Sequence, residues 1–321
     1  MDKEKEFINI IKNIIDPNFD AGGFGIGIGD DAAIVKGNID GGPLVFCSDA
    51  IVEDVHFNRE HYSFNNIGWK SIAINVSDII SMGAIPNYFT VSIGINREFS
   101  IEDFKELITG MKECSDEFKA TIVGGDIVRA EKLFINVSAV GFFDYDTSSM
   151  RRGMMRNSAQ PGDKIGVSGF LGDSLGGFLS LQKNNKADLH LTSKHFKPYP
   201  NLSLARKLYF NNVICCTDIS DGLNTELINI CESSNVSAQI DVTKLPISKN
   251  LKKSFPEDYY DMAINGGEDF ELLFTFNSLP NDIMDKIIVI GEVKEIGENQ
   301  IIYNLNGGKY SPKLSAWRHF E

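Results

Sequence analysis

The most regular helical pattern in the chain is Ile67-Gly-Trp-Lys-Ser-Ile-Ala-Ile-Asn-Val-Ser-Asp-Ile-Ile-Ser-Met82, which is followed by Gly83 and Pro86. Its apolar residues recur at helical spacing, so the sequence predicts a helix over 67–82 that ends at the glycine. Residues 87–95 then alternate between apolar and polar, which predicts a strand. A buried helix followed at once by a strand indicates a mixed fold, α/β (α+β).

Short strands and helices continue on both sides of this segment. Further strands are expected at 32–35, 43–47, 120–123, 133–143, 164–168, 213–216, 238–242, 270–276, 287–290 and 300–303, and further helices at 3–15, 100–118, 172–183, 202–210 and about 222–233. Residues 184–200 are polar and are expected to be exposed. Residues 144–149 are polar without a strong element, so we expect two domains, 1–148 and 149–321.

The charge balance limits the classes of partner. The 321 residues include 44 acidic and 31 basic side chains, which gives a net charge of −13. Binding to a nucleic-acid backbone needs an excess of Lys and Arg, so a nucleic-acid partner is not expected. No stretch of apolar residues is long enough for a membrane span. The five cysteines lack metal spacing and no signal peptide is recognised, so we expect free thiols in a cytoplasmic protein.

The segment Gly22–Val35 combines five glycines in eight residues with the pair Asp30-Asp31 and a short apolar run. Glycine lets backbone N–H groups approach a ligand closely, and carboxylates are hard oxygen ligands for metal ions. The segment therefore indicates either a loop that holds a metal ion near phosphate or an ordinary surface loop. It matches neither the P-loop motif nor the dinucleotide-binding motif.

Acidic residues recur after short apolar runs, next to glycine or to a small hydroxyl residue. They are Asp30-Asp31, Ser48-Asp49, Asp126, Asp218 with Ser220 and Asp221, and Glu268-Asp269, together with Asp78 inside the predicted helix. Any one of them alone fits a helix cap or a turn. Gathered in one cleft they would repel one another unless divalent cations lay between them, so the set predicts several Mg²⁺ ions and a polyphosphate. Arg151, Arg152 and Arg156 are candidate donors to its phosphate oxygens.

Seven segments together resemble a known family. They are 27–33, 48–57, 68–78, 124–126, 217–222, 266–274 and 317–320. Their residues and their order along the chain are similar to those of the thiamine-monophosphate kinases, in the superfamily of aminoimidazole-ribonucleotide synthetase-like ATP enzymes. The resemblance implies two α/β domains, a homodimer formed through the N-terminal domain, and ATP in a cleft between the domains.

The resemblance also implies the reaction and its residues. ATP would phosphorylate thiamine phosphate directly, assisted by several Mg²⁺ ions and without a catalytic side chain. Matching motif positions implies metal ligands at Asp31, Ser48, Asp49, Asp78, Asp126, Asp218 and Asp221, ATP contacts at Gly125, Asp126, Arg156 and Ser220, and contacts to thiamine phosphate at His56, Glu268 and Trp317.

Two features depart from the family pattern, and two alternatives stay open. Cys47 stands where many relatives have a threonine, so no metal contact is assigned to it. The segment 150–160 is longer than the pattern, and Arg156 is chosen over Arg152 by its distance from residues 161–163. The alternatives are another enzyme of the superfamily, such as aminoimidazole-ribonucleotide synthetase, and a non-catalytic protein that binds nucleotide or metal.

Overall fold

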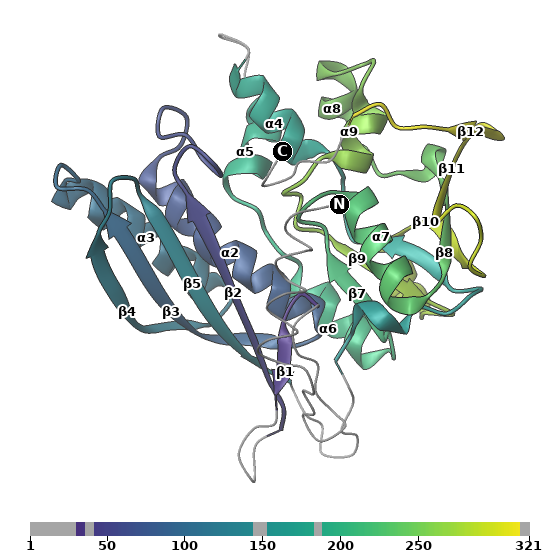
Figure 1. Cartoon of the computed structure of the whole chain (residues 1–321), viewed down its shortest axis with the longest axis horizontal. Coiled ribbons are helices and arrows are strands. Elements are labelled where there is room, and N and C mark those ends of the chain that lie inside the picture. The colour runs from purple at the N-terminus through teal and green to yellow at the C-terminus, as the bar shows by residue number, and fades with distance from the viewer. Residues whose placement is uncertain (1–29, 36–41, 144–152, 183–187, 315–321) are drawn as a thin grey trace.

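The computed structural model describes residues 30–35, 42–143, 153–182 and 188–314. It has two halves that lie side by side, each built on its own sheet (Figure 1). The mixed fold expected from the sequence is confirmed. The predicted helix 3–15, the glycines before Asp30, the boundary at 144–149, Arg152 and Trp317 lie outside the described residues.

The first sheet has the strand order β1-β2-β5-β3-β4. Its strands are β1 (Ala33–Val35), β2 (Leu44–Val52), β3 (Ile85–Ile95), β4 (Thr121–Arg129) and β5 (Phe134–Phe142). Two helices, α2 (Phe64–Ser81) and α3 (Ile101–Glu117), belong to this half. Residues on one face of β2, β3 and β5 are buried, whereas Phe46, Ser48, Tyr88 and Thr90 on the other face are exposed.

Helix α2 is the central element of the molecule. The hydroxyl of Ser63 caps it by accepting the Asn66 N–H at 3.2 Å, so the helix begins three residues earlier than predicted. Gly68 lets it approach α3 closely, since a Cβ there would lie 2.1 Å from the carbonyl oxygen of Leu107. It also contacts β7 (Cys215–Asp218) and α6 (Leu202–Phe210) of the second half, which explains why even its polar residues are buried.

The second sheet has the strand order β12-β11-β8-β10-β6-β9-β7. Its strands are β6 (Lys164–Val167), β7, β8 (Ser237–Asp241), β9 (Leu272–Phe276), β10 (Ile288–Lys294), β11 (Ile301–Leu305) and β12 (Gly308–Tyr310). The helices of this half are α4 (Asp173–Gln182), α5 (Leu189–Phe196), α6, α7 (Leu223–Ser234), α8 (Lys249–Ser254), α9 (Tyr259–Asn265) and α10 (Asn281–Met284). One apolar core includes Leu208 and Phe274 together with Ile72 and Val76 of α2, so the two halves pack through a continuous apolar contact.

Two expectations about the chain are wrong. Residues 184–200 are not uniformly exposed, because α5 buries Leu191 and His195. The short strand predicted at 120–123 continues through Gly124-Gly125-Asp126 as β4, where it pairs in parallel with β3.

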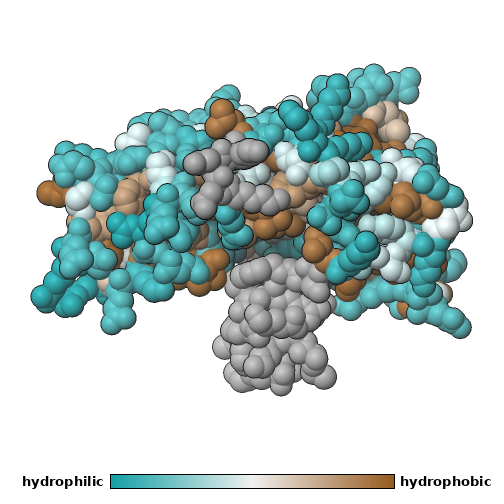
Figure 2. Space-filling view, turned by 90° about the horizontal axis from the view of Figure 1, so that it is seen from above, coloured by the Kyte–Doolittle hydropathy of each residue, from teal (hydrophilic) through white to brown (hydrophobic). Residues whose placement is uncertain are grey.

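The structure also bears on the cysteines and on the possibility of a membrane span. All five cysteines are free thiols, as expected. Among the described residues, no helix is both long and apolar enough to cross a membrane. Figure 2 shows one face of the molecule, where hydrophilic residues predominate and hydrophobic residues form separate patches.

Candidate active site

A set of carboxylates lies where α2 meets the end of β7. Asp31 precedes β1, Asp78 belongs to α2, and Asp218 is the last residue of β7. The side chain of Asp31 is 1% exposed, and Asp218 is 1% exposed. We call Asp31, Asp78 and Asp218 the acidic cluster, because the structure brings these three predicted ligands together from both halves of the chain.

Hydroxyl groups orient two members of the acidic cluster. Ser77 donates to Asp218 Oδ2 at 2.6 Å, and Ser81 donates to Asp31 Oδ2 at 2.7 Å. Both serines lie on α2, on either side of Asp78, so one helix presents a carboxylate and two hydroxyls to the same site. Thr217 also donates to Asp31 Oδ1, at 2.9 Å.

Arg156 is the cation that the structure places at this cluster. Its Nη2 contacts Asp31 Oδ1 and lies 3.3 Å from Glu226 Oε2, while its Nε donates to Thr217 at 3.1 Å. Its backbone N–H donates to Asp30 at 3.0 Å. The side chain is 17% exposed, so it is not fully enclosed.

The acidic cluster is electrostatically crowded. Burial, together with the charges of neighbouring carboxylates, raises the pKa of Asp78 and Asp218 well above the ordinary value. Burial also raises the pKa of Asp30 to about 7, with Asp31 adding to the effect, and that of Glu226 to about 7. Among the described residues, Arg156 is the arginine that contacts the set, and one positive charge does not neutralise it.

The residues fit Mg²⁺. Carboxylate and hydroxyl oxygens are hard donors, and Mg²⁺ takes one or two protein carboxylates together with water and phosphate oxygens. Among the described residues, no three His, Cys, Asp or Glu side chains already form a site for an ion. Burial and the neighbouring carboxylates disfavour the ionised forms of Asp78 and Asp218 by raising their pKa, and a bound cation would favour those forms.

Asp49 lies near the acidic cluster, whereas Ser48 does not join it. Successive residues of β2 face opposite sides of the sheet. Asp49 faces α2, where its N–H donates to Asn75 Oδ1 at 3.1 Å, and its charge raises the pKa of Asp78. Ser48 faces the exposed side, where its hydroxyl lies 3.1 Å from that of Ser138.

Gly125 and Asp126 lie on the edge strand β4, apart from the acidic cluster. Three strand spacings separate β4 from β2, which is about 14 Å across the sheet. They line a cavity of about 720 Å³ between β4 and α3, whose walls include Ile108 and Met111. Within one chain, the cavity and the acidic cluster are separate parts of the candidate site.

Ser220 and Asp221 lie in the loop between Asp218 and α7. Asp221 is exposed, and its charge raises the pKa of Glu226, so it lies near the Arg156 side of the acidic cluster. The carbonyl oxygen of Ser220 accepts the N–H of Glu268 at 2.6 Å. This contact joins the predicted nucleotide loop to the predicted substrate residue.

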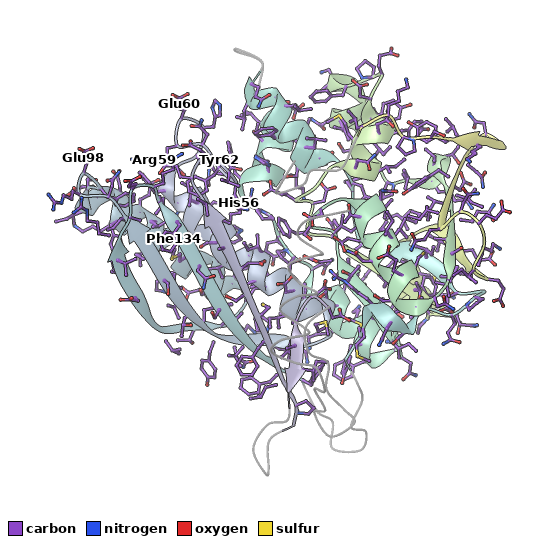
Figure 3. All side chains as sticks on the ribbon, viewed as in Figure 1. His56, Arg59, Glu60, Tyr62, Glu98 and Phe134 are labelled. Atoms are coloured by element: carbon purple, nitrogen blue, oxygen red, sulfur yellow. The ribbon has the colours of Figure 1, made fainter. Side chains whose placement is uncertain are left out.

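Glu268 is held by a second polar cluster between the halves. Its carboxylate lies 2.8 Å from Lys70 Nζ and 3.3 Å from His195 Nδ1. Burial raises its pKa, but Lys70 and His195 lower it more, so the pKa of Glu268 is lowered overall. The charge of His56 contributes to the same lowering, so the two predicted substrate residues lie near each other. Figure 3 shows His56 and Tyr62 at the end of the N-terminal sheet that faces α5.

Several residues of these two clusters are not predicted from the sequence. They are Tyr62, Lys70, Ser77, Ser81, His195 and Glu226. Lys70 had a signal, because a lysine inside an apolar helical stripe must find a buried partner. The partners of His195 come from elsewhere in the chain, so no local pattern could show them.

His195 makes a pH-dependent contribution to stability. Burial, followed by the charge of Lys70, lowers its pKa from 6.5 to about 3. Between these two pKa values the unfolded chain takes up a proton at His195 that the folded chain does not. The free energy of unfolding therefore decreases as the pH is lowered. From about pH 7.5 to about pH 5, we expect a loss of about 2 kcal/mol that His195→Gln lacks. Denaturant unfolding of both chains at each pH checks this, and equal pH dependence would contradict it.

Family models match both halves. The AIR synthase related protein, N-terminal domain, matches residues 29–143, and the AIR synthase related protein, C-terminal domain, matches residues 160–279. The matched residues include the first sheet, part of the second sheet and all three members of the acidic cluster.

Individual relatives narrow the assignment. The thiamine-monophosphate kinase of Bacillus subtilis (strain 168) is 31% identical over 311 residues, covering 92% of this chain and 94% of that protein. That of Buchnera aphidicola subsp. Schizaphis graminum is 34% identical over 310 residues, with 92% of each covered. The structure of AaThiL complexed with AMPPCP and TMP has a TM-score of 0.83 and 29% identity, covering 99% of this chain and 97% of that one. The chain belongs to the thiamine-monophosphate kinase family, which confirms the resemblance.

Proposed function

We infer that the chain transfers the γ-phosphoryl group of ATP to thiamine phosphate, which yields ADP and thiamine diphosphate. The observation that carries the inference is the acidic cluster, which α2 and β7 build from both halves in a chain of this family. A relative of the same fold binds AMPPCP, an analogue of ATP, and TMP. The inference extends that pair of ligands to this chain.

The mechanism is a direct in-line transfer. A phosphate oxygen of the substrate attacks the γ-phosphorus, and because a phosphate monoester is largely ionised near neutral pH, no strong general base is needed. Asp31, Asp78 and Asp218 would hold Mg²⁺, which supplies positive charge to the phosphate oxygens when bound. Arg156 adds a charged donor for phosphate beside them.

The cavity beside β4 suits part of the nucleotide. Ile108 and Met111 provide apolar walls for a base, and Gly125 and Asp126 line the same cavity. Asp126 lies about 14 Å across the sheet from β2, whose Asp49 borders the acidic cluster, so we assign it to the nucleotide rather than to the ions of that cluster.

A homodimer through the first sheet is part of the proposal. The outer face of the sheet exposes Phe46 and Tyr88, and the edge strand β4 exposes Val123, Ile127 and Val128. An exposed apolar sheet face with an open edge strand favours pairing with a second chain. Sedimentation equilibrium checks this, and a monomer at micromolar concentration would contradict it.

Trp317 is proposed to stack on the thiamine moiety, as the resemblance implies. Trp317→Ala is expected to raise KM for thiamine phosphate about tenfold, because the indole face attracts a cationic ring. KM for ATP is expected to stay unchanged. Leu314→Ala, at an exposed position just before this segment, is the control. An equal rise of both KM values would argue against stacking.

One assay tests the function and separates it from the alternatives. ADP release is followed with ATP and Mg²⁺, with and without thiamine phosphate, and the thiamine product is identified by mass. ADP release that requires thiamine phosphate and yields thiamine diphosphate supports the proposal. ADP release that requires an aminoimidazole-ribonucleotide precursor instead supports the related synthetase. Binding of nucleotide without turnover supports a non-catalytic role.

A further inference from the structure

A closed ring of four side chains joins the two halves. Lys70 Nζ lies 2.8 Å from Glu268 Oε1 and 3.2 Å from the Tyr62 hydroxyl. The Tyr62 hydroxyl lies 2.6 Å from His195 Nε2, and His195 Nδ1 lies 3.3 Å from Glu268 Oε2. Lys70 and Tyr62 belong to the first half, and His195 and Glu268 belong to the second.

Lys70 is the donor and Glu268 the acceptor at which both sides of the ring begin and end. The lysine ammonium can only donate, so it donates both to the carboxylate and to the tyrosine oxygen. The hydroxyl of Tyr62 then donates to Nε2 of His195, which leaves the proton of the neutral imidazole on Nδ1. Nδ1 lies 2.9 Å from the Ser174 hydroxyl and 3.3 Å from Glu268 Oε2. Both carboxylate oxygens of Glu268 are thus contacted from the buried side.

Only one member of the ring is accessible. The side chains of Lys70 and His195 are 1% and 5% exposed, and Tyr62 is 7% exposed, whereas that of Glu268 is 30% exposed. A buried lysine requires a paired anion, and here that anion is the group that reaches the surface. The ring presents one ionised carboxylate to a ligand.

The backbone of Glu268 is also constrained. Its φ is +64°, and that of Phe270 is +50°, in the left-handed region that non-glycine residues rarely adopt. Such conformations persist where the surroundings impose them, and they concentrate at ligand sites. The bond from Glu268 N–H to Ser220 and the ring through Lys70 are the contacts that impose it.

We propose that Lys70 is a positioning residue for substrate recognition, which with Tyr62 and His195 fixes the carboxylate of Glu268 against the thiamine phosphate. The proposal rests on the proposed function, since it assigns the orientation of that enzyme's substrate contact. The chemical class it selects is a substrate with a cationic or N–H-bearing ring, for which a fixed carboxylate is the complementary partner.

Kinetics of Lys70→Met test the proposal. We expect KM for thiamine phosphate to rise on the order of tenfold, while kcat and KM for ATP stay within about twofold, because ground-state binding is lost and transfer is not. Lys294→Met is the matched control, since Lys294 pairs with Glu292 at 2.7 Å on the surface. Loss of thermal stability with an unchanged KM for thiamine phosphate would overturn the proposal.

A double substitution separates positioning from mere packing. Once Glu268→Gln has removed the charge, Lys70 has no carboxylate to orient, so adding Lys70→Met should raise KM little further. Additive effects would count against the proposal. If Lys70→Met does not fold, Tyr62→Phe removes one hydroxyl from the ring, and it should raise KM for thiamine phosphate about threefold without changing that for ATP. An unmodified chain without thiamine-phosphate-dependent turnover would overturn the proposed function itself.

Discussion

Asp218→Asn is expected to lower kcat by on the order of 10²-fold or more while the chain stays folded and at least as stable. Asp218 is fully buried at the end of β7, and Ser77 donates to it at 2.6 Å. Asparagine keeps the shape of the side chain, but it loses the charge that would hold Mg²⁺ against the transferred phosphate. The loss should therefore appear in kcat, measured at saturating ATP and thiamine phosphate.

The stability part of this prediction follows from the pKa of Asp218. Burial, with the charge of Asp31 adding to it, raises that pKa well above the ordinary value. An acid with a raised pKa stabilises the folded chain at low pH, and that stabilisation is lost as the pH rises through the folded pKa. At neutral pH the carboxylate thus opposes folding, and Asn removes this cost.

Thermal unfolding with and without Mg²⁺ completes the test. Mg²⁺ should raise the Tm of the unmodified chain more than that of Asp218→Asn, because a ligand stabilises only the state that binds it. Asp282→Asn, at a side chain that is 71% exposed, is the control and should match the unmodified chain. Near-normal kcat in a folded Asp218→Asn chain would remove Asp218 from the metal site.

The sequence could predict part of this site because some of its residues carry local signals. Asp78 stands among apolar residues at helical spacing, and Asp218 follows a short apolar run. Their approach to each other depends on the packing of α2 against β7, which the motif resemblance implied and the spacing alone did not. The distance of Arg156 from residues 161–163 favours it over Arg152 as the ATP contact, and the structure places Arg156 beside Asp31.

The positions of other predicted site residues depend on the observed bounds of the strands. The strand predicted over 43–47 ends before Ser48 and Asp49, and the resemblance implies that both are metal ligands. Because β2 continues to Val52, the two side chains point to opposite faces of the sheet, and only Asp49 faces α2. Gly125 and Asp126 lie within β4 because that strand pairs with β3 from Thr121 to Arg129. This pairing overrides the low strand propensity of glycine.

Arg156→Met is expected to destabilise the chain by about 3–5 kcal/mol in the absence of Mg²⁺ and to abolish ATP use. The guanidinium contacts Asp31 and Glu226, whose side chains are 1% and 2% exposed. Removing the guanidinium leaves the buried carboxylates without their cation. The free-energy cost of this is larger than the net contribution of the ion pair to stability. Arg59→Met, where the arginine is 37% exposed and lies 3.7 Å from Glu53, should lose no more than about 1 kcal/mol.

The response of Arg156→Met to Mg²⁺ separates two roles of this arginine. One is to offset the charge of the buried carboxylates, and the other is to bind the phosphate of ATP. If the guanidinium offsets charge that Mg²⁺ can also offset, added Mg²⁺ should restore part of the lost stability but none of the ATP binding, because phosphate still lacks its bidentate donor. Calorimetric titration with an ATP analogue measures the binding, and denaturant unfolding with EDTA or Mg²⁺ measures the stability. ATP binding that survives Arg156→Met and disappears with Arg152→Met would transfer the nucleotide contact to Arg152. Arg156 would then remain the internal counter-charge of the acidic cluster.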